Sequence, residues 1–286
     1  MLSSADKTAD RFLVPSPPKA AQLIVTIYGD IVEPRGGVLW MGDLISLCAG
    51  FGVNESLVRT AVSRLVSKGQ LVGEREGRRS YYGLTAAARE EYHLAADLFF
   101  GPVDGDCGWL LTLCTDPAEQ AVLTRNGFVQ LSGSIYAASD RPGRPVLGTA
   151  FRAQMLEPDD GKLRSMVTAA FQLDGLATDY SAFVSRFADM ASGVTDELAP
   201  ETALLYRLAL VHAYREIRLR DPRLPVSALP DNWPGVVARS LFADLYRRLS
   251  DQADAYIGQN LLAKHGPLPT APEAVRDRIA TLMSSL

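Results

Sequence analysis

The sequence predicts an α+β protein that is mainly α, with an N-terminal winged helix-turn-helix, a central ferredoxin-like α+β domain and a C-terminal helical domain. Three observations carry this prediction. Residues 54–85 combine an amphipathic helix with a short basic hairpin, residues 106–171 alternate as β-α-β-β-α, and the rest has long stretches of helical apolar spacing. A length of 286 residues suits two or three such domains.

Composition changes along the chain set the expected boundaries. The first residues are polar and end in the run PSPP, which is typical of a mobile tail. We expect five segments: a flexible tail over 1–18, a winged helix-turn-helix over 19–85, a linker helix over 86–105, a ferredoxin-like domain over 106–173 and a helical domain over 174–286.

Two helices are expected before the central feature of the N-terminal domain. Residues 19–32 have the pattern of a first helix, which the run EPRGG breaks. A second, short helix is expected from Trp40 to Cys48, and the glycine-containing turn over 49–52 leads into a third. This order of helices and turn is that of a helix-turn-helix.

The third helix has one apolar and one polar face. The apolar face carries Val58, Ala61, Val62, Leu65 and Val66 at helical spacing. The opposite side, the hydroxyl face, carries Ser56, Thr60, Ser63 and Ser67, with Arg59 and Arg64 on its flanks. Asn54 is placed to cap the N-terminus and Gly69 to follow the C-terminus. Small hydroxyls allow close entry into a DNA groove and arginines reach bases or phosphates, although a surface helix that is merely wet has the same pattern.

A basic hairpin follows at once. Leu71 and Val72 begin a strand, Glu76-Gly77 marks the turn, and Ser80–Leu84 form the return strand. Arg75, Arg78 and Arg79 cluster at the tip, where they would gain from counterion release on DNA, although edge-strand arginines also protect against aggregation. The whole chain has a net charge of −4, whereas residues 54–85 carry six Lys or Arg against three Glu. The sequence therefore predicts double-stranded DNA binding through this one patch, by a homodimer.

The linker and central regions contain recognisable helix and strand signals. Thr85 is expected to cap a helix to about Phe100, usable as a rigid linker or a dimer seam through Leu94, Ala95 and Leu98. Further along, residues 109–114 predict a strand, Asp116 a helix cap, 128–138 a strand-turn-strand, and 146–156 a strand before a helix that runs to Ala170.

The C-terminal third is expected to be helical over residues 176–190, 201–220 and 235–257, with a proline-rich loop between the last two. His212 and Arg215 lie one helical turn apart, and Trp233 lies in the loop. Their residue types suit contacts to an aromatic or phosphate-bearing ligand, but a helix–loop packing cluster is the favoured interpretation. Arg141, Arg144 and Arg152 form a second basic group, which either holds the phosphates of coenzyme A or, as we favour, belongs to a solvated loop.

The residues favour no enzyme. Three cysteines without C-x-x-C spacing fit neither a disulfide framework nor a zinc site, and the three histidines show no metal-binding spacing. Asp104 and Asp106 leave open a nuclease, although acids in a glycine-rich connection are usually turn formers. No apolar run reaches about 18 residues, so we expect a cytoplasmic protein without membrane contact. Because no catalytic or metal-binding motif is present, we expect no catalytic site, metal or cofactor.

Several of these segments resemble the PaaX family of bacterial transcriptional repressors. The resemblance lies in RTAVSRL over Arg59–Leu65, GRRSYY over Gly77–Tyr82, Asp221-Pro222-x-Leu224-Pro225 and Leu229-Pro230-x-x-Trp233-x-Gly235, and it extends over roughly residues 20–260.

The resemblance implies a repressor of operons for degrading phenylacetic acid and related aromatic acids, released from operator DNA by the coenzyme A thioester of that acid. It implies that Arg59, Thr60, Ser63 and Arg64 lie on the recognition helix and that Arg78, Arg79 and Tyr81 lie on the wing. The small-molecule effector would be phenylacetyl-CoA or a related acyl-CoA. A regulator with another acyl-CoA or a free aromatic acid as effector, a nucleic-acid-processing enzyme and an adaptor are the alternatives.

Overall fold

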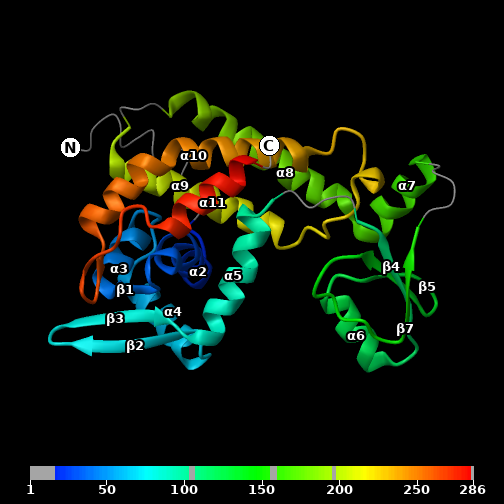
Figure 1. Cartoon of the computed structure of the whole chain (residues 1–286), viewed down its shortest axis with the longest axis horizontal. Coiled ribbons are helices and arrows are strands. Elements are labelled where there is room, and N and C mark those ends of the chain that lie inside the picture. The colour runs from blue at the N-terminus through cyan, green and yellow to red at the C-terminus, as the bar shows by residue number, and fades with distance from the viewer. Residues whose placement is uncertain (1–16, 103–106, 155–159, 195–197, 285–286) are drawn as a thin grey trace. The chain divides into compact units, whose positions relative to one another are not determined.

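The computed structural model describes residues 17–102, 107–154, 160–194 and 198–284, and it is mainly helical as the sequence predicts (Figure 1). Its α-helices are α2 (Ala20–Ile27), α3 (Met41–Ala49), α4 (Glu55–Ser67), α5 (Ala86–Phe100), α6 (Pro117–Arg125), α7 (Asp160–Phe171), α8 (Leu173–Gly193), α9 (Pro200–Arg218), α10 (Pro234–Asn260) and α11 (Glu273–Ser284). A π-helical turn, η1 (Tyr28–Val32), and two 3-10 turns, η2 (Glu33–Arg35) and η3 (Val226–Ala228), complete the described helical elements. Nearly all of the tail expected over residues 1–18 lies outside the described residues, as do Asp104 and Asp106.

The strands form small antiparallel sheets. The first has the order β1-β3-β2, from β1 (Val38–Trp40), β2 (Leu71–Glu76) and β3 (Arg79–Leu84). The second has the order β5-β6-β4-β7, from β4 (Trp109–Leu113), β5 (Val129–Ser132), β6 (Ile135–Ser139) and β7 (Thr149–Ala153). A short pair joins β8 (Leu262–Ala263) to β9 (Gly266–Pro267).

The chain divides into two compact units that are each discontinuous in sequence. The first unit comprises the described residues within 1–102, 183–219 and 238–286, and the second comprises those within 103–182 and 220–237. The N-terminal helices and sheet therefore share one unit with most of the C-terminal helices.

The first sheet corrects the helix expected from Trp40 to Cys48. Residues Val38–Trp40 form β1, with Leu39 opposite Tyr82 of β3, and the helix begins only at Met41. A three-residue strand has no periodicity of its own, and its partner lies far along the chain. Only the tertiary pairing therefore distinguishes this strand from the start of a helix.

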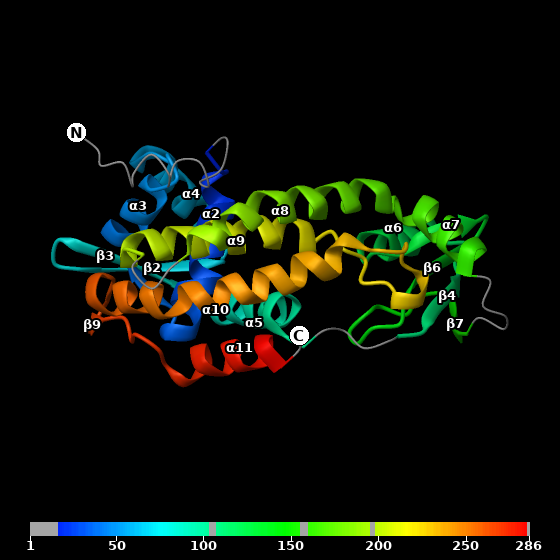
Figure 2. The same cartoon turned by 90° about the horizontal axis from the view of Figure 1, so that it is seen from above.

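Aromatic side chains hold the helices of the first unit together. The helices α9 and α10 lie side by side (Figure 2), and the rings of Tyr214 and Phe242 stack between them at 4.2 Å between centroids. Phe100, at the end of α5, packs against Phe242 at 5.9 Å and against Tyr246 at 5.1 Å. The end of the predicted linker helix is thus anchored in this helical core, since buried aromatic pairs add to the burial of apolar area.

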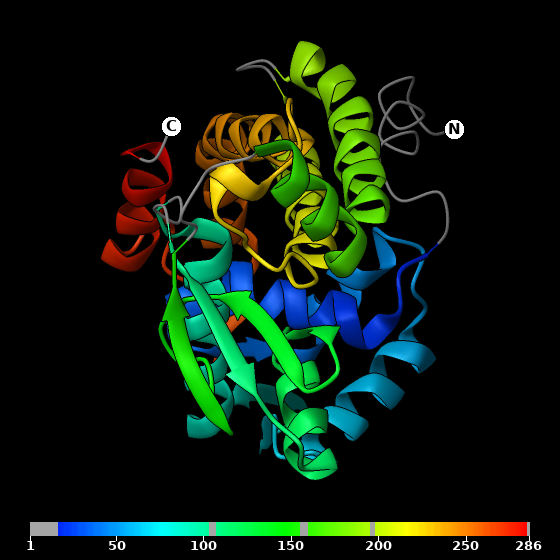
Figure 3. The ribbon, with the colours of Figure 1, turned by 90° about the vertical axis from the view of Figure 1, so that its right-hand side faces the viewer.

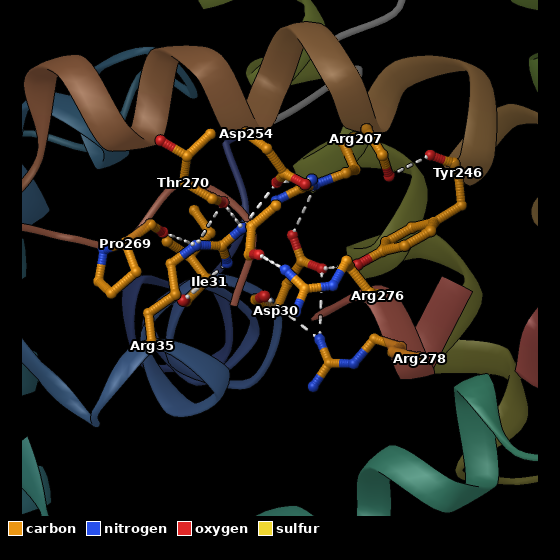
Figure 4. A network of polar contacts seen from close by, with 12 residues as sticks. Asp30, Ile31, Arg35, Arg207, Tyr246, Asp254, Pro269, Thr270, Arg276 and Arg278 are labelled. Carbon is orange, nitrogen blue, oxygen red and sulfur yellow. Dashed lines mark hydrogen bonds and ion pairs between the residues drawn. The ribbon is translucent and has the colours of Figure 1, made fainter. Parts of the chain in front are cut away.

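A buried ionic network joins the N-terminal segment to α9 and α10 (Figure 4). Arg207, fully buried, donates to Asp30 Oδ2 at 3.0 Å and to Asp254 Oδ1 at 2.6 Å. Arg35 donates to the same Asp254 oxygen at 2.7 Å and to the Thr270 carbonyl at 3.0 Å. The Tyr246 hydroxyl donates to Asp30 Oδ1 at 2.8 Å. Each carboxylate thus has several donors, which is the condition for keeping charges in a protein interior.

The second unit is a four-stranded sheet with helices packed against it (Figure 3). Its core contains Leu110, Cys114, Leu123, Phe128, Tyr136 and Ala138. Asp116 caps α6 as predicted, since its Oδ1 accepts from the Ala118 amide at 2.8 Å. Within the strand expected over 146–156, residues Thr149–Ala153 form β7, and residues 155 and 156 lie outside the described residues. Residues 140–148 hold neither helix nor strand.

Candidate nucleic-acid interface

The helix α4 has the boundaries that its sequence predicts. Asn54 Oδ1 accepts from the Leu57 amide at 3.0 Å, which caps the N-terminus. Gly69 has φ of +69°, so it takes the left-handed position just beyond the C-terminus. The buried side chains are Val58, Ala61, Val62 and Leu65, and the helix packs against α2 and α3.

Val66 was predicted to lie on the buried apolar face of α4, but its side chain is 38% exposed. It borders a groove between α4 and the first sheet. The spacing rule placed it inside, but it lies at the edge of the apolar stripe, where tertiary packing decides.

The hydroxyl face is open to solvent. Ser56, Thr60, Ser63 and Ser67 are all exposed, and Ser67 donates its hydroxyl to the Arg64 carbonyl at 2.9 Å. Among the described residues, nothing forms a hydrogen bond or ion pair with the exposed Arg64 guanidinium. A face of small polar groups with an unengaged arginine beside it has the shape and chemistry to enter a major groove.

Arg59 is engaged within the helix. It pairs with Glu55 at 2.7 Å, one turn earlier, and both side chains are 58% exposed. Such an exposed pair contributes at most about 1 kcal/mol, so an anionic partner can compete for the arginine. The i, i+4 spacing of Glu55 and Arg59 is the ordinary sequence signal for such a pair, and it was not among the features predicted above.

The basic hairpin, formed by β2 and β3, places its arginines at an exposed tip. The two strands meet at Gly77 and Arg78, and Gly77 has φ of +59°. Arg75 donates to the Gly77 carbonyl at 3.2 Å, and Arg79 lies over the Trp40 ring at 5.0 Å from its centroid. All three tip arginines are exposed, which suits contact with a phosphate backbone.

Tyr81 requires a correction. The sequence resemblance placed it among the DNA contacts of the wing, but its side chain is only 5% exposed. It sits on the inward side of β3, opposite Glu74 on one flank and Trp40 on the other. Because strand residues alternate between two faces, the inward side chain supports the sheet and cannot reach a duplex.

A groove joins the two predicted parts of the interface. It has a volume of 420 Å³, and Arg59 and Ser63 of α4 and Arg75 and Ser80 of the basic hairpin line it. Its other lining residues are Met41, Val66, Gly73, Glu74 and Tyr82. The hydroxyl face and the basic hairpin therefore form one continuous surface of the first unit.

One residue of this surface comes from the far end of the chain. Lys264, in the turn between β8 and β9, forms an ion pair with Glu74 of the groove. Asp43 Oδ2 accepts from the Leu262 amide at 2.7 Å and fixes β8 against α3. Lys264 offsets an acidic charge within the groove, and no local sequence signal links it to Glu74.

The predicted effector residues do not line one common pocket. His212 is buried at 3% exposure, with Nδ1 at 2.9 Å from Thr26 Oγ1, and burial lowers its pKa below the ordinary value. Trp233, in the second unit, contacts the Tyr180 ring edge-on at 5.9 Å and is 8% exposed. Each of the two residues is thus packed within its own unit, with different partners. Arg215 lines a pocket of the first unit whose lining includes neither His212 nor Trp233.

The three arginines of the second basic group, Arg141, Arg144 and Arg152, all have hydrogen-bond or ion-pair partners. Arg141 donates to the Arg223 carbonyl at 2.7 Å, and Arg144 donates to Ser139 Oγ at 3.0 Å and to the Pro222 carbonyl at 3.3 Å. Arg152 pairs with Asp140 at 2.6 Å. Arg141 and Arg144 thereby hold the proline-rich loop against the segment that follows β6, so these two side chains do not belong to a simply solvated loop.

No three His, Cys, Asp or Glu side chains within the described residues gather as metal ligands would. None of the helices in that part of the chain combines the length and apolarity needed to cross a bilayer.

Two regions of the chain match models of one protein family. The family model described as PaaX-like protein matches residues 19–88, and that described as PaaX-like protein C-terminal domain matches residues 171–259. The chain is 32% identical over 276 residues to the transcriptional repressor PaaX of Escherichia coli strain K12, covering 88% of this chain and 87% of that protein. Among solved structures, the uncharacterised protein Rv0674 from Mycobacterium tuberculosis matches with a TM-score of 0.47 and 21% identity, over 75% of this chain and 89% of that one.

Proposed function

We propose, because this chain belongs to the PaaX-like family, that it is a DNA-binding transcriptional repressor acting in the cytoplasm. The observation that carries the proposal is the surface that joins the exposed hydroxyl face of α4 to the basic hairpin through one groove. The E. coli relative bears the name of a transcriptional repressor. No catalytic role is proposed.

In this proposal residues 19–85 act as a winged helix-turn-helix, with α4 as the recognition helix. Thr60 and Ser63 allow close approach to base edges, and Arg64 is available for a guanine. Arg59 would exchange Glu55 for a base or phosphate. Arg75, Arg78 and Arg79 would lie along the backbone, while Asn54 and Ser56 approach at the helix N-terminus.

We propose that the repressor binds as a homodimer. Residues 54–85 carry a net charge of +3, which limits the affinity of one copy for DNA. Two recognition helices in successive major grooves, about 34 Å apart, would multiply it.

A ferredoxin-like origin is proposed for the sheet of the second unit. Its first three strands and α6 follow the β-α-β-β order of that motif, and all its strand pairs are antiparallel. The helix that the motif has before its last strand is replaced by residues 140–148, and α7 follows β7. The second unit therefore differs from the ferredoxin-like motif in the position of its second helix, which follows the last strand.

The proposed operon is one for degradation of phenylacetate or a related aromatic acid, and the proposed effector is phenylacetyl-CoA. An effector that prefers the arrangement not bound to DNA would release the operator by shifting that equilibrium. Another acyl-CoA or a free aromatic acid is the alternative effector.

A mobility-shift titration tests the proposal, with the DNA upstream of the protein's own gene as probe. We expect Arg64→Ala to weaken binding by about 1–3 kcal/mol, or about 5- to 150-fold. The control is Arg247→Ala, which removes an exposed arginine of α10 outside the interface. Equal affinity of the two variants would refute the assignment of α4. Addition of phenylacetyl-CoA should release the probe, and persistent binding would refute that effector.

A further inference from the structure

We propose that the pocket enclosed by α2, α5 and α9 is the binding site for a small apolar acyl group, whose carboxylate or thioester carbonyl is held by Arg215. The pocket is lined by Val25, Tyr92, Ala95, Phe99, Val211 and Arg215, all within the first unit. The inference rests on the proposed function in one respect, namely that the occupant is the effector.

The size of the pocket limits its occupant. Its volume is 210 Å³, whereas a cavity of about 150 Å³ lined by apolar side chains accommodates benzene. One ring with a short acyl arm therefore fits, and the nucleotide part of a coenzyme A thioester does not. Glu91, which also lines the pocket, is exposed, so the pocket reaches the surface and leaves room for such a group outside.

Arg215 gives the pocket its preference for an oxygen acceptor. The residue is half-buried on α9, and within the described residues it makes no hydrogen bond or ion pair. Burial lowers its pKa, because the charged guanidinium loses hydration there. A guanidinium among apolar walls gains most from an anionic or carbonyl oxygen, to which it donates charge-assisted hydrogen bonds.

The buried acidic residue in the pocket lining, Asp30, already has hydrogen-bond donors of its own. Asp30 accepts hydrogen bonds from Arg207 and Tyr246, at 3.0 Å and 2.8 Å. The Asp30 carboxylate is therefore already paired, and the other acidic residue of the lining, Glu91, is exposed to solvent. Arg215 is the cationic side chain in the lining.

The pocket also touches the elements that present the DNA-binding surface. Gln70, in its lining, joins α4 to β2, and its carbonyl accepts from the Thr85 amide at 3.2 Å. Thr85 in turn caps α5, whose residues form much of the wall. An occupant thus contacts both the wall helix α5 and the connection between recognition helix and hairpin. A preference for one arrangement of these elements would change DNA affinity.

Isothermal titration calorimetry on the full chain tests the site with three probes: phenylacetate, phenylacetyl-CoA and free coenzyme A. We expect at least one of the first two to bind more tightly than free coenzyme A. Ala95→Phe fills the pocket and should weaken binding at least tenfold, whereas Leu94→Phe adds the same ring at a position that is 73% exposed and should not. Arg215→Gln should weaken binding by about tenfold or more, against Arg247→Gln on α10 as control.

The outcomes separate this inference from the proposed function. Operator binding and thermal melting establish whether each variant is folded. If Ala95→Phe does not fold, Arg215→Gln carries the test of the pocket. Failure of the wild type to bind either probe, or unchanged affinity in the folded pocket variants, overturns the site. If wild-type release of the operator by phenylacetyl-CoA persists in those variants, the proposed function stands without this pocket. Variant-sensitive binding without any operator binding would support the pocket and refute the repressor.

Discussion

Removing Asp254 should destabilise the first unit far more than removing another paired aspartate of the same helix. Asp254 Oδ1 accepts from Arg207 at 2.6 Å and from Arg35 at 2.7 Å, and the two arginine side chains are 0% exposed. Asp254→Ala leaves both guanidiniums buried beside fewer acceptors. Arg207 keeps Asp30, and Arg35 keeps backbone carbonyls, so the loss is that of one broken buried pair, about 3–5 kcal/mol.

The matched control is Asp244→Ala. Asp244, also on α10, faces Arg247 at 3.4 Å and Arg248 at 3.5 Å, but its side chain is 45% exposed. Exposed pairs contribute about 0–1 kcal/mol, and the change in helix propensity is the same in both variants. The difference between the two variants therefore isolates burial.

Urea unfolding followed by far-ultraviolet circular dichroism measures this difference. With an m-value of about 2–3 kcal/mol/M, Asp254→Ala should lower the midpoint by about 1–2.5 M relative to Asp244→Ala. If Asp254→Ala does not fold, Asp254→Asn keeps one acceptor oxygen without the charge and should show a smaller loss in the same direction. Equal midpoints for the Asp254 and Asp244 variants would refute the role assigned to the network.

Three further predictions concern the interface and its support. Replacing Arg78 and Arg79 together by alanine should reduce the salt slope of operator binding by about 1 to 2 units, and an unchanged slope would remove the hairpin from the interface. Because burial lowers the pKa of His212, the unfolded chain takes up its proton more readily. The unfolding free energy of the wild type should therefore fall as pH drops below about 7. The unfolding free energy of His212→Gln should fall less than that of the wild type between about pH 7.5 and 5.5, and an equal fall would contradict the role assigned to His212. Gly69→Ala should destabilise by about 1 kcal/mol in a denaturant titration because φ is +69°, although nothing lies within 4 Å of the added methyl; a neutral result would contradict the conformational argument.

The candidate interface was predictable from sequence where local geometry governs it. The helical period places Thr60 and Ser63 outside and Val58 and Val62 inside, and the structure shows this arrangement. Asn54 and Gly69 mark the helix ends through hydrogen bonds within a few residues. Such features depend on neighbours along the chain, and a sequence contains them directly.

The sequence-based predictions that the structure corrects concern residues whose partners lie far away along the chain. Tyr81 and Trp40 were misplaced because pairing between β1 and β3 decides which side of the sheet is buried. The sequence left His212 as a candidate ligand contact, because its actual partner, Thr26, lies 186 residues away. Neither relation leaves a periodic trace in the sequence.

The sequence by itself determined a mainly helical α+β protein and a polar helix followed by a basic hairpin, since short-range hydrogen bonds and side-chain spacing settle both. Only the tertiary structure decided that Asp30, Arg207 and Asp254 form one buried network, that Lys264 reaches Glu74, and that Arg215 faces an apolar pocket. Those contacts join segments up to 190 residues apart. Their formation depends on how packed helices exclude water around particular charges, which no local pattern specifies.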